Sequence, residues 1–266
     1  MSNQGEVHPS TIVEDGAKIG KNTTIGPFCY IGPNVTIGDN CKIGPSVHIY
    51  GATTIGNENQ IFSHCSLGAP PQDFSAKGEE TRLIIGNKNI FREYISVHRG
   101  TLKQHGETVI GSENYFMAYV HVAHDVTIGN NVLIINSVNL AGHVTINDKA
   151  VIGGASNVAR WVRVGKGAYI GGASAVDRDV LPYTASYGNR LLLKGINIVG
   201  LRKTGFERKH ISEALEFYKL LETSIMSPKV FISHEENLAE FKDNPIVFEI
   251  VKFIEESELG LASFMN

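Results

Sequence analysis

Residues 25–49 read IGPFCYIGPNVTIGDNCKIGPSVHI, in which an isoleucine returns at every sixth position and is usually followed by glycine. The same six-residue period, with an apolar residue in first place, runs over 7–67, returns over 85–97 and continues over 110–176. Self-similarity at a short fixed period is the signature of a solenoid, in which each repeat packs on its neighbours. The sequence therefore predicts a repeat protein.

The hexad predicts a left-handed parallel β-helix. Each hexad supplies one short strand and one turn, and three hexads close a triangular coil in which the first residues point inward. We expect glycine and asparagine at the corners, because they adopt backbone conformations that other residues resist. The fifth residue also points inward and must be small, and the three cysteines, Cys29, Cys41 and Cys65, all stand there. They are predicted to be buried fillers rather than redox or metal-binding residues.

Composition excludes several classes of protein. The net charge of −3 over 266 residues argues against a globally basic nucleic-acid-binding protein. No run of about 18 apolar residues predicts a membrane span, and the first residues, MSNQGEVHPS, lack the pattern of a signal peptide. Three cysteines do not suggest a disulfide framework, so we expect a cytoplasmic protein, and neither a cofactor nor a metal is expected.

Two segments break the period, 69–84 and 101–109, and contain PPQDFSAKGEET and TLKQHGET. Long loops in a solenoid lie on its surface and often carry function. Beyond residue 180, ERKHISEALEFYKLLETS (207–224) predicts an amphipathic helix, and a further helix is expected after Asn244 and Pro245. The apolar positions of the first helix are Ile211, Leu215, Tyr218 and Leu221 or Glu222. We therefore expect a β-helix domain over residues 1–190 and a helical domain over 191–266.

Charge is uneven along the chain. Residues 160–210 hold ten Lys or Arg against three acids, whereas residues 211–266 hold four Lys against eleven acids. The basic stretch can receive an acidic partner or phosphates, or it can form ion pairs with the acidic helices, and both interpretations stay open. Flat-sided prisms assemble side by side, so we expect a homotrimer with sites between neighbours.

Three histidines stand out in YVHVAHDVTIG and NLAGHVTI: His121, His124 and His143. The separation of His124 and His143, one coil plus one residue, places them on adjacent coils at a similar corner. Asp125 follows His124 and is able to orient its ring, so that the histidine removes a proton from a nucleophile. The alternatives are solvated corner residues, or a zinc site of clustered histidines as in trimeric β-helix carbonic anhydrases.

The chain resembles the bacterial UDP-N-acetylglucosamine acyltransferases, enzymes of the first step of lipid A synthesis. The resemblance rests on the hexads, the PQD of the first loop, IFREYISVHRGT, HVAHD, LAGHV and the helical tail, and it covers nearly the whole chain. It implies a cytoplasmic homotrimer that moves a 3-hydroxyacyl chain from acyl carrier protein to the 3-position of a UDP-linked glucosamine. Acyl carrier protein is acidic, so the basic stretch suits a docking surface.

The resemblance also implies roles for individual residues. His124 would be the general base, Asp125 its partner, and the Gly142 N–H the donor that stabilises the oxyanion. Gly172, in IGGAS, falls where the family limits acyl length, and a glycine there leaves room for a longer chain. The residues expected to contact the sugar, the acyl donor or the nucleotide are Gln72, Asp73, Lys77, His98, His121, His143, Arg160, Asn197 and Lys203.

The chain departs from the family pattern around the nucleotide sugar. Ala159, Arg160 and Trp161 replace a usual His-Gln-Phe run. Ser75, Val199 and Thr204 replace a loop lysine, a glutamate and the second residue of a basic pair. Losing a polar partner in a buried site costs about 1–3 kcal/mol. Two alternatives therefore stand beside the leading hypothesis: a paralogue that acylates another nucleotide sugar, for example the nitrogen of a 3-amino sugar, and a non-catalytic binding protein.

Overall fold

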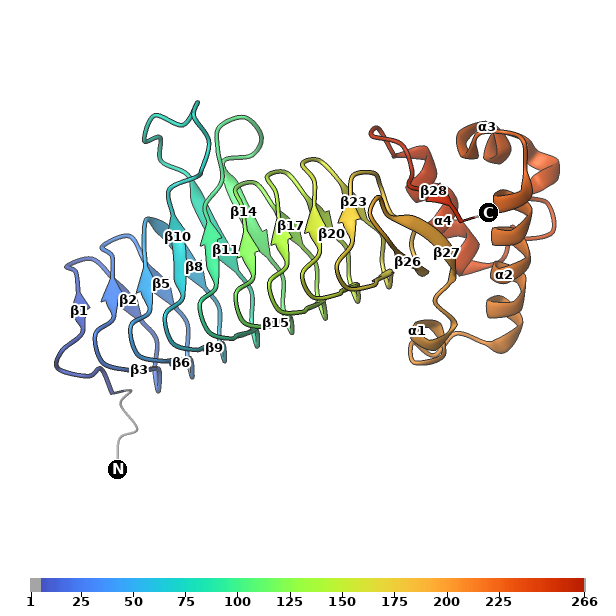
Figure 1. The fold of residues 1–266 in the computed structure, drawn as a ribbon. Coiled ribbons are helices and arrows are strands. Elements are labelled where there is room, and N and C mark those ends of the chain that lie inside the picture. Colours follow the sequence, from blue (N-terminus) through green and yellow to red (C-terminus); the bar gives the residue numbers. More distant parts are fainter. Residues whose placement is uncertain (1–5, 266) are drawn as a thin grey trace.

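The computed structural model describes residues 6–265. Over this range the chain winds into a parallel β-helix, a three-sided prism of short strands with a helical segment at its C-terminal end (Figure 1). Through most of the prism, a strand pairs in parallel with the strand one coil further on, so that Ile12 lies opposite Tyr30 and Lys18 opposite Thr36. The strands Thr184–Tyr187 and Leu192–Ile196, at its C-terminal end, pair antiparallel. The predicted β-helix with a helical C-terminal part is confirmed. The predicted boundary between residues 190 and 191 stays a prediction.

The described strands form three sheets, one for each side of the prism. Sheet 1 contains β1 (Ile12–Val13), β4 (Tyr30–Ile31), β7 (His48–Ile49), β10 (Ser66–Ala69), β13 (Ser96–His98), β16 (His121–Val122), β19 (Asn139–Leu140), β22 (Asn157–Val158) and β25 (Ala175–Val176). Sheet 2 contains β2 (Lys18–Ile19), β5 (Thr36–Ile37), β8 (Ala52–Ile55), β11 (Arg82–Ile85), β14 (Glu107–Ile110), β17 (Thr127–Ile128), β20 (Thr145–Ile146) and β23 (Arg163–Val164). Sheet 3 contains β3 (Thr24–Ile25), β6 (Lys42–Ile43), β9 (Gln60–Ile61), β12 (Ile90–Phe91), β15 (Tyr115–Phe116), β18 (Leu133–Ile134), β21 (Val151–Ile152), β24 (Tyr169–Ile170), β26 (Thr184–Tyr187), β27 (Leu192–Ile196) and β28 (Ser263–Phe264).

The core of the prism is built as the hexad predicts. First residues such as Ile31 and Ile49 are fully buried, and the fifth-position cysteines lie among them as free thiols. Burial raises the pKa of the Cys65 thiol to about 12, which keeps it protonated and unreactive. The outermost coil is the exception: Val7 and Val13 are more than a third exposed, because no described coil covers them.

The corners differ from the prediction. The left-handed backbone conformation falls mainly on the fourth residue of the hexad, which is rarely glycine; Asn22, Phe28 and Asn40 are examples, with φ of 57°, 59° and 57°. The glycine in the second position of the hexad is required for a different reason. A Cβ on Gly20 would lie 2.4 Å from the backbone of Gly38 in the next coil, so glycine is required by close stacking of coils rather than by φ.

The two interruptions are surface loops on adjacent coils. Residues 70–81 connect β10 to β11, and residues 99–106 connect β13 to β14, so both leave the prism at the corner between sheets 1 and 2. They stand side by side above the prism as the two cyan and green loops of Figure 1.

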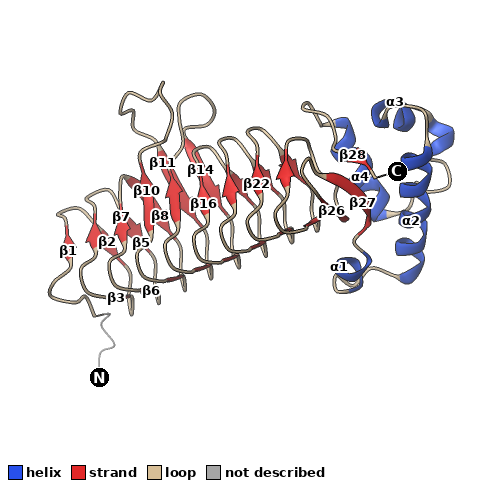
Figure 2. Ribbon diagram, viewed as in Figure 1, coloured by secondary structure: helices blue, strands red, loops and turns tan. Residues whose placement is uncertain are grey.

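The helical segment covers the C-terminal end of the prism (Figure 2). It comprises α1 (Ile198–Arg202), α2 (Arg208–Thr223), α3 (Pro228–Ser233), a 3₁₀ turn (Glu235–Asn237) and α4 (Pro245–Glu255). The Asn244 side chain caps α4 as predicted, by accepting from the backbone N–H groups of Ile246 and Val247. The predicted face of α2 was wrong at Leu215, which is 36% exposed, because Ala214 and Phe217 face the core instead. In the described chain no helix combines the length and apolar character that a membrane crossing needs.

Candidate active site

A groove of about 950 Å³ runs along sheet 1, beside the corner from which the two loops rise. Gln72, Asp73 and Phe74 of the first loop and Lys103 of the second form part of its wall. Its floor is made by successive coils, including the outward residues of β16, β19, β22 and β25. The loops and the sheet thus enclose a site that neither would form alone.

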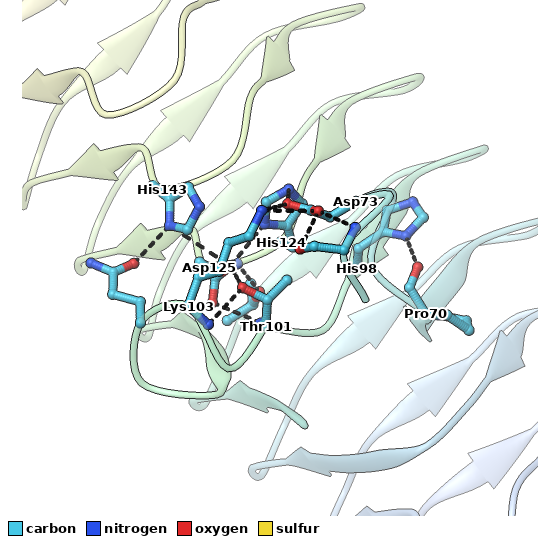
Figure 3. A network of polar contacts seen from close by, with 11 residues as sticks. Pro70, Asp73, His98, Thr101, Lys103, His124, Asp125 and His143 are labelled. Carbon is cyan, nitrogen blue, oxygen red and sulfur yellow. Dashed lines mark hydrogen bonds and ion pairs between the residues drawn. The ribbon is translucent and has the colours of Figure 1, made fainter. Parts of the chain in front are cut away.

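His124 and Asp125 lie at the corner that ends β16, next to this groove (Figure 3). The His124 Nδ1 lies 2.8 Å from the Asp125 Oδ2, and the Asp125 carboxylate also accepts the Thr101 backbone N–H at 2.8 Å and the Thr101 hydroxyl at 2.7 Å. Because a carboxylate accepts at Nδ1, that nitrogen carries the proton, and Nε2 is left as a base. This pair has the geometry of an oriented general base.

Asp73 approaches the other side of the His124 ring. Its Oδ2 lies 3.9 Å from the His124 Nε2 and 2.7 Å from the Lys103 Nζ. Its Oδ1 accepts from the Ser75 backbone N–H and hydroxyl at 2.8 and 2.7 Å. The hydrogen bonds from Lys103 and then Ser75 hold the pKa of Asp73 well below its ordinary value, so this side chain is a carboxylate at neutral pH.

His143 lies beside His124 on the next coil, as the spacing predicts, with the two ring centroids 5.1 Å apart. Its Nδ1 lies 3.0 Å from the Gln104 Oε1, and its ring stacks on Trp161 with centroids 3.8 Å apart. Burial lowers the pKa of His143, against the opposing effect of Asp125, so the ring is neutral at neutral pH. Its Nε2 is buried and has no hydrogen-bond partner among residues 6–265, which leaves it available to a bound polar group.

His121 and His98 form a second pair, with ring centroids 5.3 Å apart. His121 lines the groove and its Nδ1 contacts the Ser96 hydroxyl at 2.8 Å. Burial, and then the neighbouring His98, lower the pKa of His121. His98 is buried behind it and donates from Nδ1 to the Pro70 carbonyl at 2.6 Å, so it anchors the base of the first loop.

Gly142 lies directly against the ring of His124. A Cβ there would come within 2.5 Å of the His124 Cε1 and 2.8 Å of its Nε2, so only glycine fits. Within the described part of the chain, no hydrogen bond engages the Gly142 N–H, and the residue lines the groove. An N–H in this position is a candidate oxyanion donor close to the base.

The remaining predicted residues do not all meet in this groove. Arg160 lines it, as does Ala159, whereas Lys77 is exposed on the first loop and outside it. Asn197 and Lys203 line a second cavity of about 480 Å³ over sheet 3, together with Val199 and Thr204. The Asn197 side chain also caps α1 by accepting from Gly200 and donates to the Gly167 carbonyl.

Gly172 lines neither cavity and stands at a corner of the prism near the Gly154 carbonyl. Four residues that contact His143, Asp125 or Asp73 were not singled out from the sequence as site residues: Thr101, Lys103, Gln104 and Trp161. Three of them belong to the second loop, whose sequence carries no periodic signal that would place them.

One group of side chains in the described chain has its donor atoms close enough together to hold a metal ion. Donor atoms of His124, Asp125 and His143 all lie within 4.8 Å of one another. The His124 Nδ1 and both Asp125 oxygens are already engaged in the short hydrogen bonds described above. The arrangement therefore fits a proton relay better than a set of free ligands.

Comparison with known proteins agrees with the fold and the motifs. A family model described as bacterial transferase hexapeptide (six repeats) matches residues 16–51, 34–69 and 107–142. Another, described as UDP-N-acetylglucosamine O-acyltransferase, domain 2, matches residues 179–262. A protein of Thermodesulfovibrio yellowstonii named acyl-[acyl-carrier-protein]–UDP-N-acetylglucosamine O-acyltransferase is 41% identical over 256 residues, 96% of this chain and 98% of that protein. One of the same name from Paraburkholderia xenovorans is 40% identical over 258 residues, with the same coverage.

Solved structures agree as well. The UDP-N-acetylglucosamine acyltransferase of Campylobacter jejuni superposes with a TM-score of 0.91 at 33% identity, covering 98% of this chain and 100% of that one. The Arabidopsis enzyme superposes with a TM-score of 0.84 at 32% identity and the same coverage. The chain is thus a left-handed β-helix transferase built from hexapeptide repeats, as the sequence predicts. Within that class it belongs to the UDP-N-acetylglucosamine O-acyltransferase family.

Proposed function

We propose that this protein transfers a 3-hydroxyacyl chain from acyl carrier protein to the 3-hydroxyl of UDP-N-acetylglucosamine, in the cytoplasm, as the first step of lipid A synthesis. Membership of the family supports the reaction. The observation that carries the mechanism is the His124–Asp125 pair, whose free Nε2 lies against Gly142 at the groove.

The proposed chemistry follows from the two sides of the His124 ring. Nε2 removes the proton of the sugar 3-hydroxyl while the oxygen attacks the thioester carbonyl carbon, and Asp125 stabilises the imidazolium that forms. The Gly142 N–H donates to the oxyanion of the tetrahedral intermediate. As the C–S bond breaks, His124 returns the proton to the thiolate of the carrier, which leaves as a thiol and regenerates the base.

A homotrimer explains why the predicted residues occupy two faces. The groove with His124 lies on sheet 1, whereas Asn197 and Lys203 line a cavity over sheet 3. Sheet 3 presents a column of apolar outward residues in register: Tyr115, Leu133, Val151 and Tyr169. Packing this column on sheet 1 of a neighbour buries it and brings the two cavities together. In such a trimer we expect Gly172 to limit the acyl chain.

Acyl carrier protein, the proposed donor, is acidic and needs a basic surface. Part of the basic stretch is occupied within the chain: Arg163 pairs with Glu256 at 2.9 Å and Lys166 with Glu249 at 2.6 Å. Arg202 and Arg208 form no ion pair with another described residue, and both line a further cavity beside α1 and α2. We propose these two arginines as part of the docking surface.

Transfer from a purified acyl carrier protein to UDP-N-acetylglucosamine tests the proposal directly. His124→Ala is expected to lower kcat by about 10²- to 10⁴-fold, the usual contribution of a general base. Undiminished transfer by this variant would reject His124 as the base. Carrier binding without transfer to any sugar would instead favour a non-catalytic binding protein.

The altered residues around the nucleotide support a second candidate for the acceptor sugar. Ala159 in the groove and Val199 and Thr204 in the second cavity remove polar side chains that the family pattern places there. A 3-amino analogue of the sugar would need the same base and oxyanion donor. Assays with a panel of UDP-sugars and one acyl donor distinguish the two, since preference for UDP-N-acetylglucosamine excludes this alternative.

A further inference from the structure

Lys103 is the one ammonium group that the second loop places against the first loop at the groove. Its Nζ lies 2.7 and 3.0 Å from the two carboxylate oxygens of Asp73, a residue 30 positions earlier. The Asp73 side chain is 8% exposed and the Lys103 side chain is 45% exposed. The pair therefore ties the two loops together with its acid turned inward, toward His124 (Figure 3).

This ion pair stands next to a ring already held by a carboxylate. His124 has Asp125 at Nδ1, 2.8 Å away, and Asp73 on its Nε2 side, 3.9 Å away. Two carboxylates favour the protonated imidazolium, and a protonated ring cannot accept a proton from the acceptor sugar. The negative charge of these carboxylates must therefore be partly offset if the His124 Nε2 is to act as a base near neutral pH.

The other groups around the ring offset this negative charge less directly than Lys103 does. Asp125 is already saturated by Thr101, and His143 and His121 are neutral neighbours. The charged and titratable groups that border His124 or its groove are Asp73, Asp125, Asp177, Lys103, Arg160, Arg190, His121 and His143. Of the three cations, Lys103, Arg160 and Arg190, Lys103 is the one in direct contact with the carboxylate that faces Nε2.

We propose that Lys103 is a positioning residue for the reaction: its ammonium holds Asp73 in place and offsets the charge of this carboxylate beside the Nε2 of His124. The inference rests on the proposed function, because it assigns a consequence to the protonation of His124. It also explains the orientation of Asp73: Oδ1 accepts from Ser75 and from Lys103, whereas Oδ2 accepts from Lys103 and faces His124.

The test follows the protonation of His124 in two ways, by the acid limb of the kcat/KM profile and by NMR titration of its ring in the unliganded protein. Lys103→Met removes the cation, so we expect the acid limb and the NMR midpoint to move to higher pH by about 0.5–1 unit. Lys103→Arg keeps the cation and is expected to stay near wild type. Lys18→Met removes one positive charge from the exposed strand β2, far from the groove, and controls for net charge.

Asp73→Asn is expected to shift the NMR midpoint of His124 in the opposite direction, and it leaves Lys103 in place. With one carboxylate fewer the imidazolium is disfavoured, so the NMR midpoint of His124 is expected to fall, and the double variant with Lys103→Met is expected to lie between the single variants. The NMR readout needs no substrate and is interpretable even where Asp73 also contacts the sugar. Circular dichroism and thermal melting establish that each variant is folded.

Two results would overturn the inference: folded Lys103→Met with an unmoved midpoint, or Lys103→Arg shifted as far as Lys103→Met. Either leaves the proposed function intact as long as His124→Ala is inactive. Conversely, full activity of His124→Ala would reject the proposed mechanism, whatever the titration of the Lys103 variants.

Discussion

At the scale of single residues, the site depends on how tightly its neighbours confine the His124 ring. Asp125 fixes one nitrogen, and Thr101 fixes Asp125 through both its backbone N–H and its hydroxyl. Gly142 closes the face next to Nε2, and its own N–H has no hydrogen-bond partner among residues 6–265. In the proposed mechanism, the position and tautomer of His124 and the oxyanion donor are thus set before any substrate binds, which is the condition for electrostatic catalysis.

Gly142→Ala tests this confinement. Its Cβ would lie 2.5 Å from the His124 Cε1, so the ring must move away from Asp125 or the coil must shift. We expect kcat to fall by about 10²-fold or more, as for a displaced base, with a loss of about 1–3 kcal/mol in the free energy of unfolding from overpacking. Gly32→Ala, where the nearest atom to the Cβ is 3.3 Å away, is the matched control on the same sheet. Equal kinetics for both variants would refute the role given to Gly142.

At the scale of the elements, the stacking of coils determines which hexad positions tolerate a side chain. Gly38→Ala would place its Cβ 2.4 Å from the Asn57 side chain and 2.7 Å from the Gly56 backbone, so it should lower the free energy of unfolding by about 1–3 kcal/mol. Asn40→Gly relieves a left-handed φ of 57°, so it should change the free energy of unfolding by less than about 1 kcal/mol. Urea unfolding measures both. A larger loss for Asn40→Gly would show that corner conformation, not stacking, governs the coil.

These elements also show how far sequence reasoning reaches. The hexads, the buried cysteines and the proximity of His124 to His143 were predictable, because in a solenoid a sequence separation of one coil is a distance in space. The contact of Lys103 with Asp73 was not, because two aperiodic loops meet only through their tertiary arrangement. The predicted apolar face of α2 failed for a related reason. Leu215 fits the helical period, but Ala214 and Phe217 are buried instead, and Phe217 packs on Phe231 and Phe241 of the helical segment.

The junction between the prism and the helical segment gives a pH dependence. Asp179 is fully buried and accepts from the Arg163 backbone N–H at 2.8 Å and from the Ser257 hydroxyl at 2.7 Å. Burial raises the pKa of Asp179, although these hydrogen bonds oppose the shift. As pH rises above about 4, the unfolded chain loses this proton before the folded chain does, so the group's contribution to stability falls until the raised folded pKa is passed.

Asp179→Asn should remove this dependence of the free energy of unfolding on pH, which is at most about 1.4 kcal/mol per pH unit for one group. Urea unfolding of the two proteins between pH 3 and 7 checks it, with the variant gaining on the wild type as pH rises. Asp39→Asn, at an exposed corner, serves as the control. Parallel stability curves for Asp179→Asn and wild type would contradict the assignment.

At the scale of the whole molecule, the opposite charges of the two C-terminal stretches have a structural use. Arg163 pairs with Glu256, directly after α4, and Lys166 pairs with Glu249 of α4, so these ion pairs fasten the acidic helical segment to the prism. The Glu249 carboxylate also accepts from the Tyr183 hydroxyl at 2.6 Å. The ion-pair interpretation is therefore confirmed for Arg163 and Lys166. The interpretation as a partner surface stays a prediction, which we assign to Arg202 and Arg208.

The division of the predicted site between two faces makes a sharp prediction for the assembly. In the proposed trimer the His124 groove of one protomer meets the Lys203 cavity of its neighbour, so His124→Ala and Lys203→Glu damage different halves of each site. Co-expressed with different tags and purified as mixed trimers, the two inactive variants should regain activity at about one third of the sites, because one of the three interfaces in each mixed trimer joins an intact groove to an intact cavity. His124→Ala mixed with Gly142→Ala should regain none, because both changes lie in the same groove of one protomer. Recovery in both mixtures or in neither, or a monomer in solution, would refute a site shared between neighbours.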